Sequence, residues 1–148
     1  MAQPEALNDL RAKFGDKIRR VEEKNDRRTY VNIAEGDLTD VARYLCNKEG
    51  RLVTITGIDT RSGVELLYPF FFADEHHLIT LKVMARKPKP SVPSLATWLP
   101  AANWSEREIQ DLLGVTFTGH PDPRRLLLAD SWPEGVHPLR RDFKGLPE

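Results

Sequence analysis

Residues 103–119 read NWSEREIQDLLGVTFTG and predict a short helix around which the rest of the chain is organised. Ser105 is expected to be the N-cap, and Glu108 three residues later completes a capping box. Trp104 and Ile109 then fall at the N′ and N4 positions of a hydrophobic staple. This pattern predicts that the helix begins just after Ser105.

The other end of this helix is marked by Gly114, which follows the last apolar pair and suits a left-handed terminal residue. Glu106 and Glu108 place negative charge in the first turn, where the helix dipole favours it. A helix of about two turns is marginal by itself. We therefore expect packing against neighbouring segments to hold it in place.

The first 86 residues predict two further helices and a small antiparallel sheet. Apolar residues recur at helical spacing in residues 4–14 and 37–49. Strand-like composition or alternation is found in residues 17–23, 29–33, 51–60, 64–73 and 77–86. Residues 17–33 are predicted to form a charged, half-solvated hairpin, and the alternative is that the first helix continues to Val21. Short connections between the later strands favour antiparallel neighbours.

Residues 64–73 are almost continuously apolar, which is typical of a central strand that is covered on both faces. Pro69 lies inside this strand and cannot donate a hydrogen bond to the ladder. A β-bulge at Pro69, or a register in which its missing N–H faces outward, would resolve the conflict.

The composition excludes several classes of protein. The chain has 148 residues, the size of one domain, with 22 Lys+Arg and 22 Asp+Glu. A formal charge of zero argues against nucleic-acid binding, which usually needs a basic excess. The longest apolar stretches are too short to span a membrane, and the first residues lack the apolar core of a signal peptide. We expect a cytosolic protein.

Cys46 is the only cysteine, so this sequence cannot form a disulfide or a thiolate-ligated iron–sulfur site within itself. It lies beside the apolar stripe of the second predicted helix. A free cysteine in that position is more often a small buried hydrophobe than a reactive thiol, because no nearby basic group lowers its pKa.

No catalytic or metal-binding constellation is evident. The four histidines are either adjacent on a predicted turn or isolated beside prolines, and no glycine-rich phosphate loop is present. Glu108 and Asp111 share one face of the helix and could act as ligands or as acid/base groups, but no second segment offers matching residues. Arg107 and Asp111 are spaced for a structural ion pair. The residues predict a binding or structural module.

The end of the chain is an extended arm. Five prolines interrupt residues 119–148, and no helical or alternating period survives there. The arm nevertheless carries leucines, aromatic residues and paired arginines, a composition found at binding hot spots. We predict an α+β domain at residues 1–118 and a partner-binding arm at 119–148, within the same structural unit. The alternative is an arm that wraps its own domain.

A long ordered string of motifs covers the last third of the chain. The segments are PAANWSERE at residues 100–108, Asp111, Gly114, GHPDPRRLLL at 119–128, WPEG at 132–135 and PLRRDF at 138–143. In these residues the chain resembles the C subunit, of the 30 kDa type, of complex I, the respiratory-chain NADH:quinone oxidoreductase. Energy-converting membrane-bound nickel–iron hydrogenases and formate hydrogenlyases share this family. Leu113 stands where complex I members often have phenylalanine, so the hydrogenase branch stays open.

The resemblance implies a hydrophilic-arm subunit that binds no cofactor or metal and has no catalytic site of its own. It would scaffold the large subunit, of the quinone-site or nickel–iron type, and the small iron–sulfur subunit during electron transfer coupled to ion translocation. Iron–sulfur clusters, flavin or nickel–iron would belong to the partners. The complex would hold the chain in the cytoplasm, peripheral to the inner face of the cell membrane. The expected partner-interface residues are Glu106, Arg107, Glu108, Asp111, Arg124, Arg125, Trp132, Arg140, Asp142 and Phe143.

Overall fold

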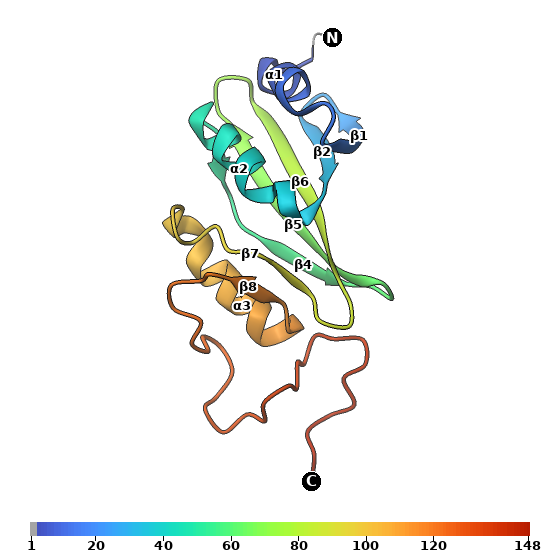
Figure 1. Ribbon diagram of the computed structural model, residues 1–148, viewed down its shortest axis with the longest axis vertical. Coiled ribbons are helices and arrows are strands. Elements are labelled where there is room, and N and C mark those ends of the chain that lie inside the picture. The colour runs from blue at the N-terminus through green and yellow to red at the C-terminus, as the bar shows by residue number, and fades with distance from the viewer. Residues whose placement is uncertain (1–2) are drawn as a thin grey trace.

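The protein is described by a computed structural model that covers residues 3–148, and it has the predicted α+β class (Figure 1). The helices are α1 (Glu5–Phe14), α2 (Leu38–Asn47) and α3 (Asn103–Leu113), with short 3-10 helices η1 (Glu35–Asp37) and η2 (Pro100–Ala102). The strands are β1 (Ile18–Asn25), β2 (Arg28–Ile33), β3 (Arg51–Leu52), β4 (Thr56–Asp59), β5 (Gly63–Phe72), β6 (His77–Arg86), β7 (Ser91–Pro93) and β8 (Thr116–Thr118).

The main sheet has the order β1-β2-β6-β5-β3, and β4 pairs with β5 beyond β3 along the same edge. The pairing is antiparallel except between β2 and β6, which run parallel. The sheet is therefore mixed rather than wholly antiparallel, because the long connection through α2 returns the chain alongside β2. The charged hairpin of β1 and β2 is confirmed, and the first helix does not continue to Val21.

Helices α1 and α2 cover one face of this sheet, and α2 lies in front of β5 and β6 in Figure 1. Along β5 the even-numbered residues 64–72 are all buried against the helices, whereas 65, 67, 69 and 71 are more exposed. Phe71 is 38% exposed. The prediction that this strand is covered on both faces is therefore wrong for residues 3–148. An almost continuously apolar strand can leave its alternate side chains partly exposed.

The ladder is irregular opposite Pro69, which agrees with a bulge, one of the two expected ways to accommodate this residue. Leu52 pairs with Phe70 and Thr56 pairs with Leu67, so residues 53–55 lie opposite only Tyr68 and Pro69. The Val53 N–H donates to the Pro69 carbonyl at 2.9 Å. The predicted strand 51–60 is accordingly split into β3 and β4 at the residue that cannot donate to it.

The start of α3 differs from the prediction. Helical geometry begins at Asn103 directly after η2, and Ala102 at the N-cap makes no side-chain hydrogen bond. The capping box is wrong because Pro100, which is preset for the first turn of a helix, starts the helical path before Ser105. Trp104 is 71% exposed and forms no staple.

The end of α3 agrees with the prediction, since Gly114 has a φ of 72° and its N–H donates to the Gln110 carbonyl at 3.0 Å. Cys46 is half-buried beside the core, and burial raises the pKa of its thiol. Gly114 is therefore the predicted left-handed end of the helix, and the raised pKa of Cys46 agrees with a small buried hydrophobe rather than a reactive thiol.

Candidate functional site

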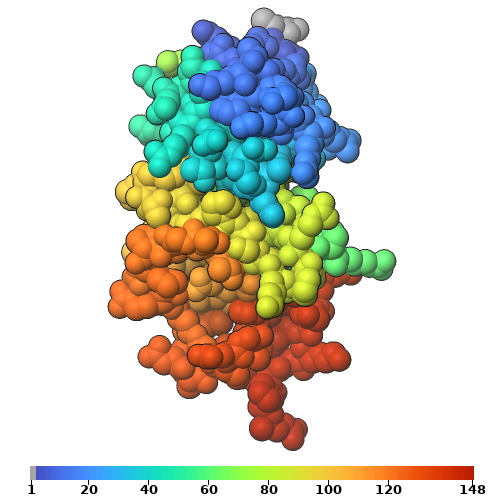
Figure 2. Space-filling view, in the orientation of Figure 1, coloured from blue at the N-terminus to red at the C-terminus, as the bar shows by residue number. Residues whose placement is uncertain are grey.

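Residues 119–148 form an arm without helix or strand, which passes under α3 and makes one end of the elongated molecule (Figures 1 and 2). The opposite end is formed by α1. Three groups of polar contacts fasten this arm to α3 and β4. Most of them join a side chain of the domain to the backbone of the arm.

The first group comes from one face of α3. Arg107 donates from Nε to the Arg124 carbonyl at 2.8 Å and from Nη2 to the Arg125 carbonyl at 2.9 Å. Gln110 donates from Nε2 to the Pro123 carbonyl at 2.7 Å. These contacts fix the direction in which the arm leaves the domain.

The second group is centred on Asp111, which is buried. Its Oδ2 accepts the N–H groups of Leu126 and Leu127 at 2.9 Å and of Leu128 at 3.2 Å. Three successive N–H groups around one oxygen form an anion-binding nest. The carboxylate is thus occupied in shaping the arm. We call this arrangement of Asp111 and residues 126–128 the arm clasp.

The third group is an ion cluster around Asp59, whose side chain is buried. Lys87 Nζ lies 2.7 Å from Oδ1, Arg140 Nε lies 3.8 Å from Oδ2, and the Arg141 N–H donates to Oδ2 at 2.8 Å. Burial alone would raise the pKa of Asp59, but Lys87, the Arg141 N–H and the Arg140 charge outweigh it and lower that pKa. The cluster ties β4, the segment after β6 and the arm together.

The arm also satisfies carbonyl groups that the end of α3 leaves free. His137 Nδ1 lies 2.9 Å from the Asp111 carbonyl oxygen, and the Leu139 N–H donates to the Leu112 carbonyl at 3.0 Å. The His137 ring passes so close to Gly114 that a Cβ atom there would lie 2.5 Å from Cδ2. The end of the helix and the arm are therefore fitted to each other.

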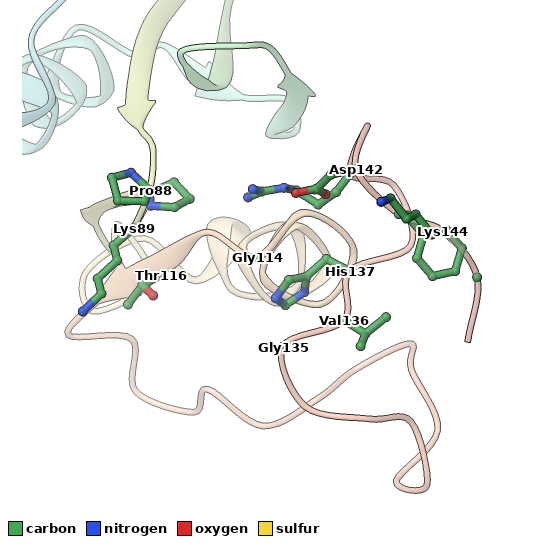
Figure 3. A pocket seen from close by; sticks show the side chains of 13 residues that line it. Pro88, Lys89, Gly114, Thr116, Gly135, Val136, His137, Asp142 and Lys144 are labelled. Carbon is green, nitrogen blue, oxygen red and sulfur yellow. Dashed lines mark ion pairs between the residues drawn. The ribbon is translucent and has the colours of Figure 1, made fainter. Parts of the chain in front are cut away.

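A cavity of about 590 Å³ lies between the arm, the end of α3 and the segment before β7 (Figure 3). Lys89 and Thr116 line it from one side, Asp142 and Lys144 line it from the arm, and His137 lies between them. Its lining mixes charges of both signs. Within residues 3–148, no group of three or more His, Cys, Asp or Glu side chains is placed to hold a metal ion.

Glu106 lies inside the domain rather than at its surface. It is fully buried, with Ser94 Oγ donating at 2.5 Å and the Leu95 N–H at 2.7 Å, while His120 Nε2 lies 3.8 Å away. Burial raises the pKa of Glu106 despite the hydrogen bonds from Ser94 and Leu95. Its contacts order the turn that leads into η2.

The other expected interface residues fall into two sets. Arg107, Asp111, Arg125 and Arg140 hold the chain's own arm. The remaining ones lie on the surface or on the arm: Glu108, Arg124 and Asp142 are exposed, and Trp132 stacks on Phe143 with ring centroids 6.3 Å apart. The structure thus separates residues that hold the arm in place from residues that lie on the surface of α3 or of the arm.

The leucines noted in the arm were not among the expected interface residues, yet several apolar side chains point away from the domain. Leu127 is 58% exposed and Leu139 is 60% exposed, and Leu146 and Trp104 are also exposed. The sequence signal for these exposed side chains was a group of leucines in the arm that fit neither a helical nor an alternating spacing. None of the helices within residues 3–148 is long and apolar enough to cross a membrane.

The chain matches a known protein family over most of its length. Residues 31–148 match the family described as "Respiratory-chain NADH dehydrogenase, 30 Kd subunit". The chain is 32% identical over 146 residues to a subunit of the NADH-quinone oxidoreductase of Chloroherpeton thalassium, covering 94% of this chain and 60% of that protein. It is 47% identical over 117 residues to formate hydrogenlyase subunit 5 of Escherichia coli K12, covering 76% of this chain and 21% of that protein.

This chain therefore spans less than two thirds of the length of either relative. Among solved structures, a chain of the membrane-bound sulfane sulfur reductase, described as an archaeal respiratory membrane complex, superposes with a TM-score of 0.84 at 22% identity. That match covers 94% of this chain and 84% of the other, and it shows a common fold.

Proposed function

Because this chain belongs to the family of the 30 kDa subunit of respiratory-chain NADH dehydrogenase, we propose that it is a scaffold subunit of a complex-I-type NADH:quinone oxidoreductase. In this role it binds no cofactor and holds a large subunit of the quinone-site type and a small iron–sulfur subunit together. The iron–sulfur clusters and flavin lie in its partners. The chain is peripheral to the inner face of the cell membrane through the complex.

One observation carries this proposal: the arm is fastened by its backbone and displays its apolar side chains. The N–H groups of Leu126, Leu127 and Leu128 are all turned to Asp111, while the Leu127 side chain is left 58% exposed. A segment that served only to complete its own core would bury these side chains. Exposed apolar anchors on an ordered segment are typical of binding sites.

The alternative is the equivalent subunit of an energy-converting, membrane-bound nickel–iron hydrogenase or formate hydrogenlyase. The higher identity to the formate hydrogenlyase relative, 47% against 32%, favours it. The large partner would then hold nickel–iron instead of shaping a quinone site. Both versions give this chain the same scaffold role.

The test is co-purification of partner subunits from membranes with the tagged full chain. In the double variant Leu127→Asp/Leu139→Asp, we expect partner recovery to fall at least tenfold, because burying each leucine at an interface contributes about 1.5–3 kcal/mol. Asn8→Asp adds a charge at an exposed position on α1 and is the matched control. Mass spectrometry of the recovered subunits separates the complex I branch from the hydrogenase branch.

Circular dichroism must show that the double variant remains folded. Unchanged recovery of all partners with this variant would refute the role given to the arm. Stoichiometric flavin or metal bound to the purified chain would refute the cofactor-free scaffold.

A further inference from the structure

The face of the main sheet opposite α1 and α2, which we call the open face, presents an apolar stripe. Strand register places the following apolar side chains on it: Leu67, Pro69 and Phe71 of β5, Leu78 and Met84 of β6, and Ile58 of β4. Glu65 of β5 and Thr80 and Lys82 of β6 lie on the same face. Phe71 is 38% exposed and Ile58 is 46% exposed. No helix within residues 3–148 covers this stripe, since the alternate residues of β5 stay accessible. Contiguous apolar surface of this kind marks interaction sites.

Cationic side chains flank one end of the stripe. Arg28 of β2 pairs with Leu78, Leu78 with Phe71, and Phe71 with Arg51 of β3, so the four side chains form one row across four strands. Neither arginine takes part in an ion pair among the described residues. The row therefore has an apolar centre and two arginines without ion-pair partners.

A hollow of about 500 Å³ lies at this end of the open face, lined by Arg27, Arg28, Phe71, His76 and Leu78. It combines an apolar floor with a cationic rim. A bound segment that presents an apolar side chain flanked by carboxylates would complement both the apolar floor and the cationic rim of this hollow.

The open face as a whole carries more positive than negative side chains without ion-pair partners. Lys82 also forms no ion pair within residues 3–148 and lies 4.8 Å from the Tyr30 ring centroid. The carboxylate of Glu22 is already shared between Arg20 and Lys24, at 3.1 and 3.2 Å. Glu65, which lies between Ile58 and Met84, also forms no ion pair within residues 3–148, but Arg28, Arg51 and Lys82 outnumber this carboxylate on the open face.

The open face and the arm lie on different sides of the sheet. Asp59, through which the arm reaches β4, pairs with buried Val64 and so points to the helix-covered face. Ile58, the residue before it, points to the open face. A partner on the arm and a partner on the open face can therefore be bound at the same time.

We propose that the open face docks a segment of a second partner subunit, which presents apolar side chains flanked by carboxylates. This inference rests on the proposed scaffold function. A protein segment is favoured over a lipid surface because the apolar side chains lie flush within the sheet rather than on a protruding loop. It is favoured over nucleic acid because the chain carries no net charge.

The first test is thiol labelling of the assembled complex and of the purified chain. In a Cys46→Ser background, single variants Phe71→Cys, Leu139→Cys and Asn8→Cys report on the open face, the arm and α1. We expect maleimide labelling of Phe71→Cys to be at least tenfold slower in the complex than in the free chain. Protection of Leu139→Cys without protection of Phe71→Cys overturns this inference alone, and protection of neither overturns the scaffold function as well.

The second test is charge reversal in the full chain. The variant Arg28→Glu/Arg51→Glu should lower recovery of one partner subunit at least tenfold and leave the arm-dependent partner within twofold. Arg61→Glu, in the exposed loop between β4 and β5, is the control and should change neither. Full recovery of every partner with the double variant overturns the proposal.

Sedimentation with phosphatidylglycerol vesicles examines the lipid alternative. We expect the purified wild-type chain to stay in solution. Binding to these vesicles that is lost in Arg28→Glu/Arg51→Glu would assign the open face to a lipid surface and overturn the protein partner.

Discussion

Replacing Asp111 by asparagine tests whether the clasp holds the arm. Asp111→Asn keeps the size of the side chain and removes the charge that faces the N–H groups of residues 126–128. A hydrogen bond to a charged group contributes about 1.5–3 kcal/mol net and a neutral one about 0.5–1.5 kcal/mol. Three bonds would therefore lose roughly 3 kcal/mol. Because the three amides are only partly buried, water offsets some of this loss, and we expect about 2 kcal/mol.

Two measurements check this value. Urea unfolding should show a free energy of unfolding that is lower by about 2 kcal/mol, and hydrogen exchange at amides 126–128 should accelerate roughly 30-fold. Glu108→Gln is the matched control, since Glu108 carries the same charge on the same helix but is exposed. It should change the free energy by less than about 0.5 kcal/mol. An Asp111→Asn variant that matches the control in both measurements would refute the clasp.

Three further substitutions probe the neighbouring contacts. Gly114→Ala should destabilise the fold by about 2 kcal/mol, from left-handed strain and the close approach of His137, and a Tm within about 2 °C of wild type would contradict this. Asp59 has a lowered pKa, so its stabilisation is present above the unfolded pKa of about 3.9 and fades as the pH falls below it. The free energy of unfolding of Asp59→Asn should therefore fall less steeply than that of wild type as the pH falls below about 3.9. An equally steep fall in both proteins would exclude a stabilising ion cluster. Glu106 has a raised pKa, so its contribution is greatest below the unfolded pKa of about 4.3 and falls as the pH rises through the raised pKa. The stability of Glu106→Gln relative to wild type should therefore increase from pH 4 to pH 7, and a constant difference would show that Glu106 titrates normally.

The local pattern of the sequence was sufficient to predict most of the helices and strands. The stripe of α2 and the hairpin of β1 and β2 were predicted because their periods and turn residues are encoded over a few neighbouring positions. Pro69 indicated an irregular ladder, since its missing N–H has to be accommodated by a bulge or by an outward-facing register. The start of α3 was misplaced because two valid start signals compete within six residues. The helical path starts at the earlier signal, Pro100, so Ser105 lies inside the helix.

The contacts that matter for function were not encoded locally. Asp111 was chosen as an interface residue, but its partners are backbone N–H groups 15 to 17 positions away, which any residue type could supply. Asp59 drew no attention because its cations come from Lys87 and Arg140, on two other segments. The open face was hidden for a related reason. An apolar strand does not record which of its faces the helices cover.

The clasp also has a consequence for assembly, because a free arm would have to be ordered at the moment of binding. Fixing each backbone residue costs about 1–2 kcal/mol, so an arm that is already held presents Leu127 and Leu139 at a much lower cost. Asp111→Asn should therefore weaken partner binding although Asp111 is buried beneath the arm. The dissociation constant for the arm-dependent partner should rise by the factor by which the clasped fraction of the arm falls, and it approaches roughly 30-fold where the arm of the variant is mostly released. Glu108→Gln separates this effect from loss of charge on α3. If exchange at amides 126–128 shows that the arm of the variant is mostly released while the dissociation constant stays within twofold of wild type, the partner binds the arm without needing it preformed, and the clasp serves only the stability of the free chain.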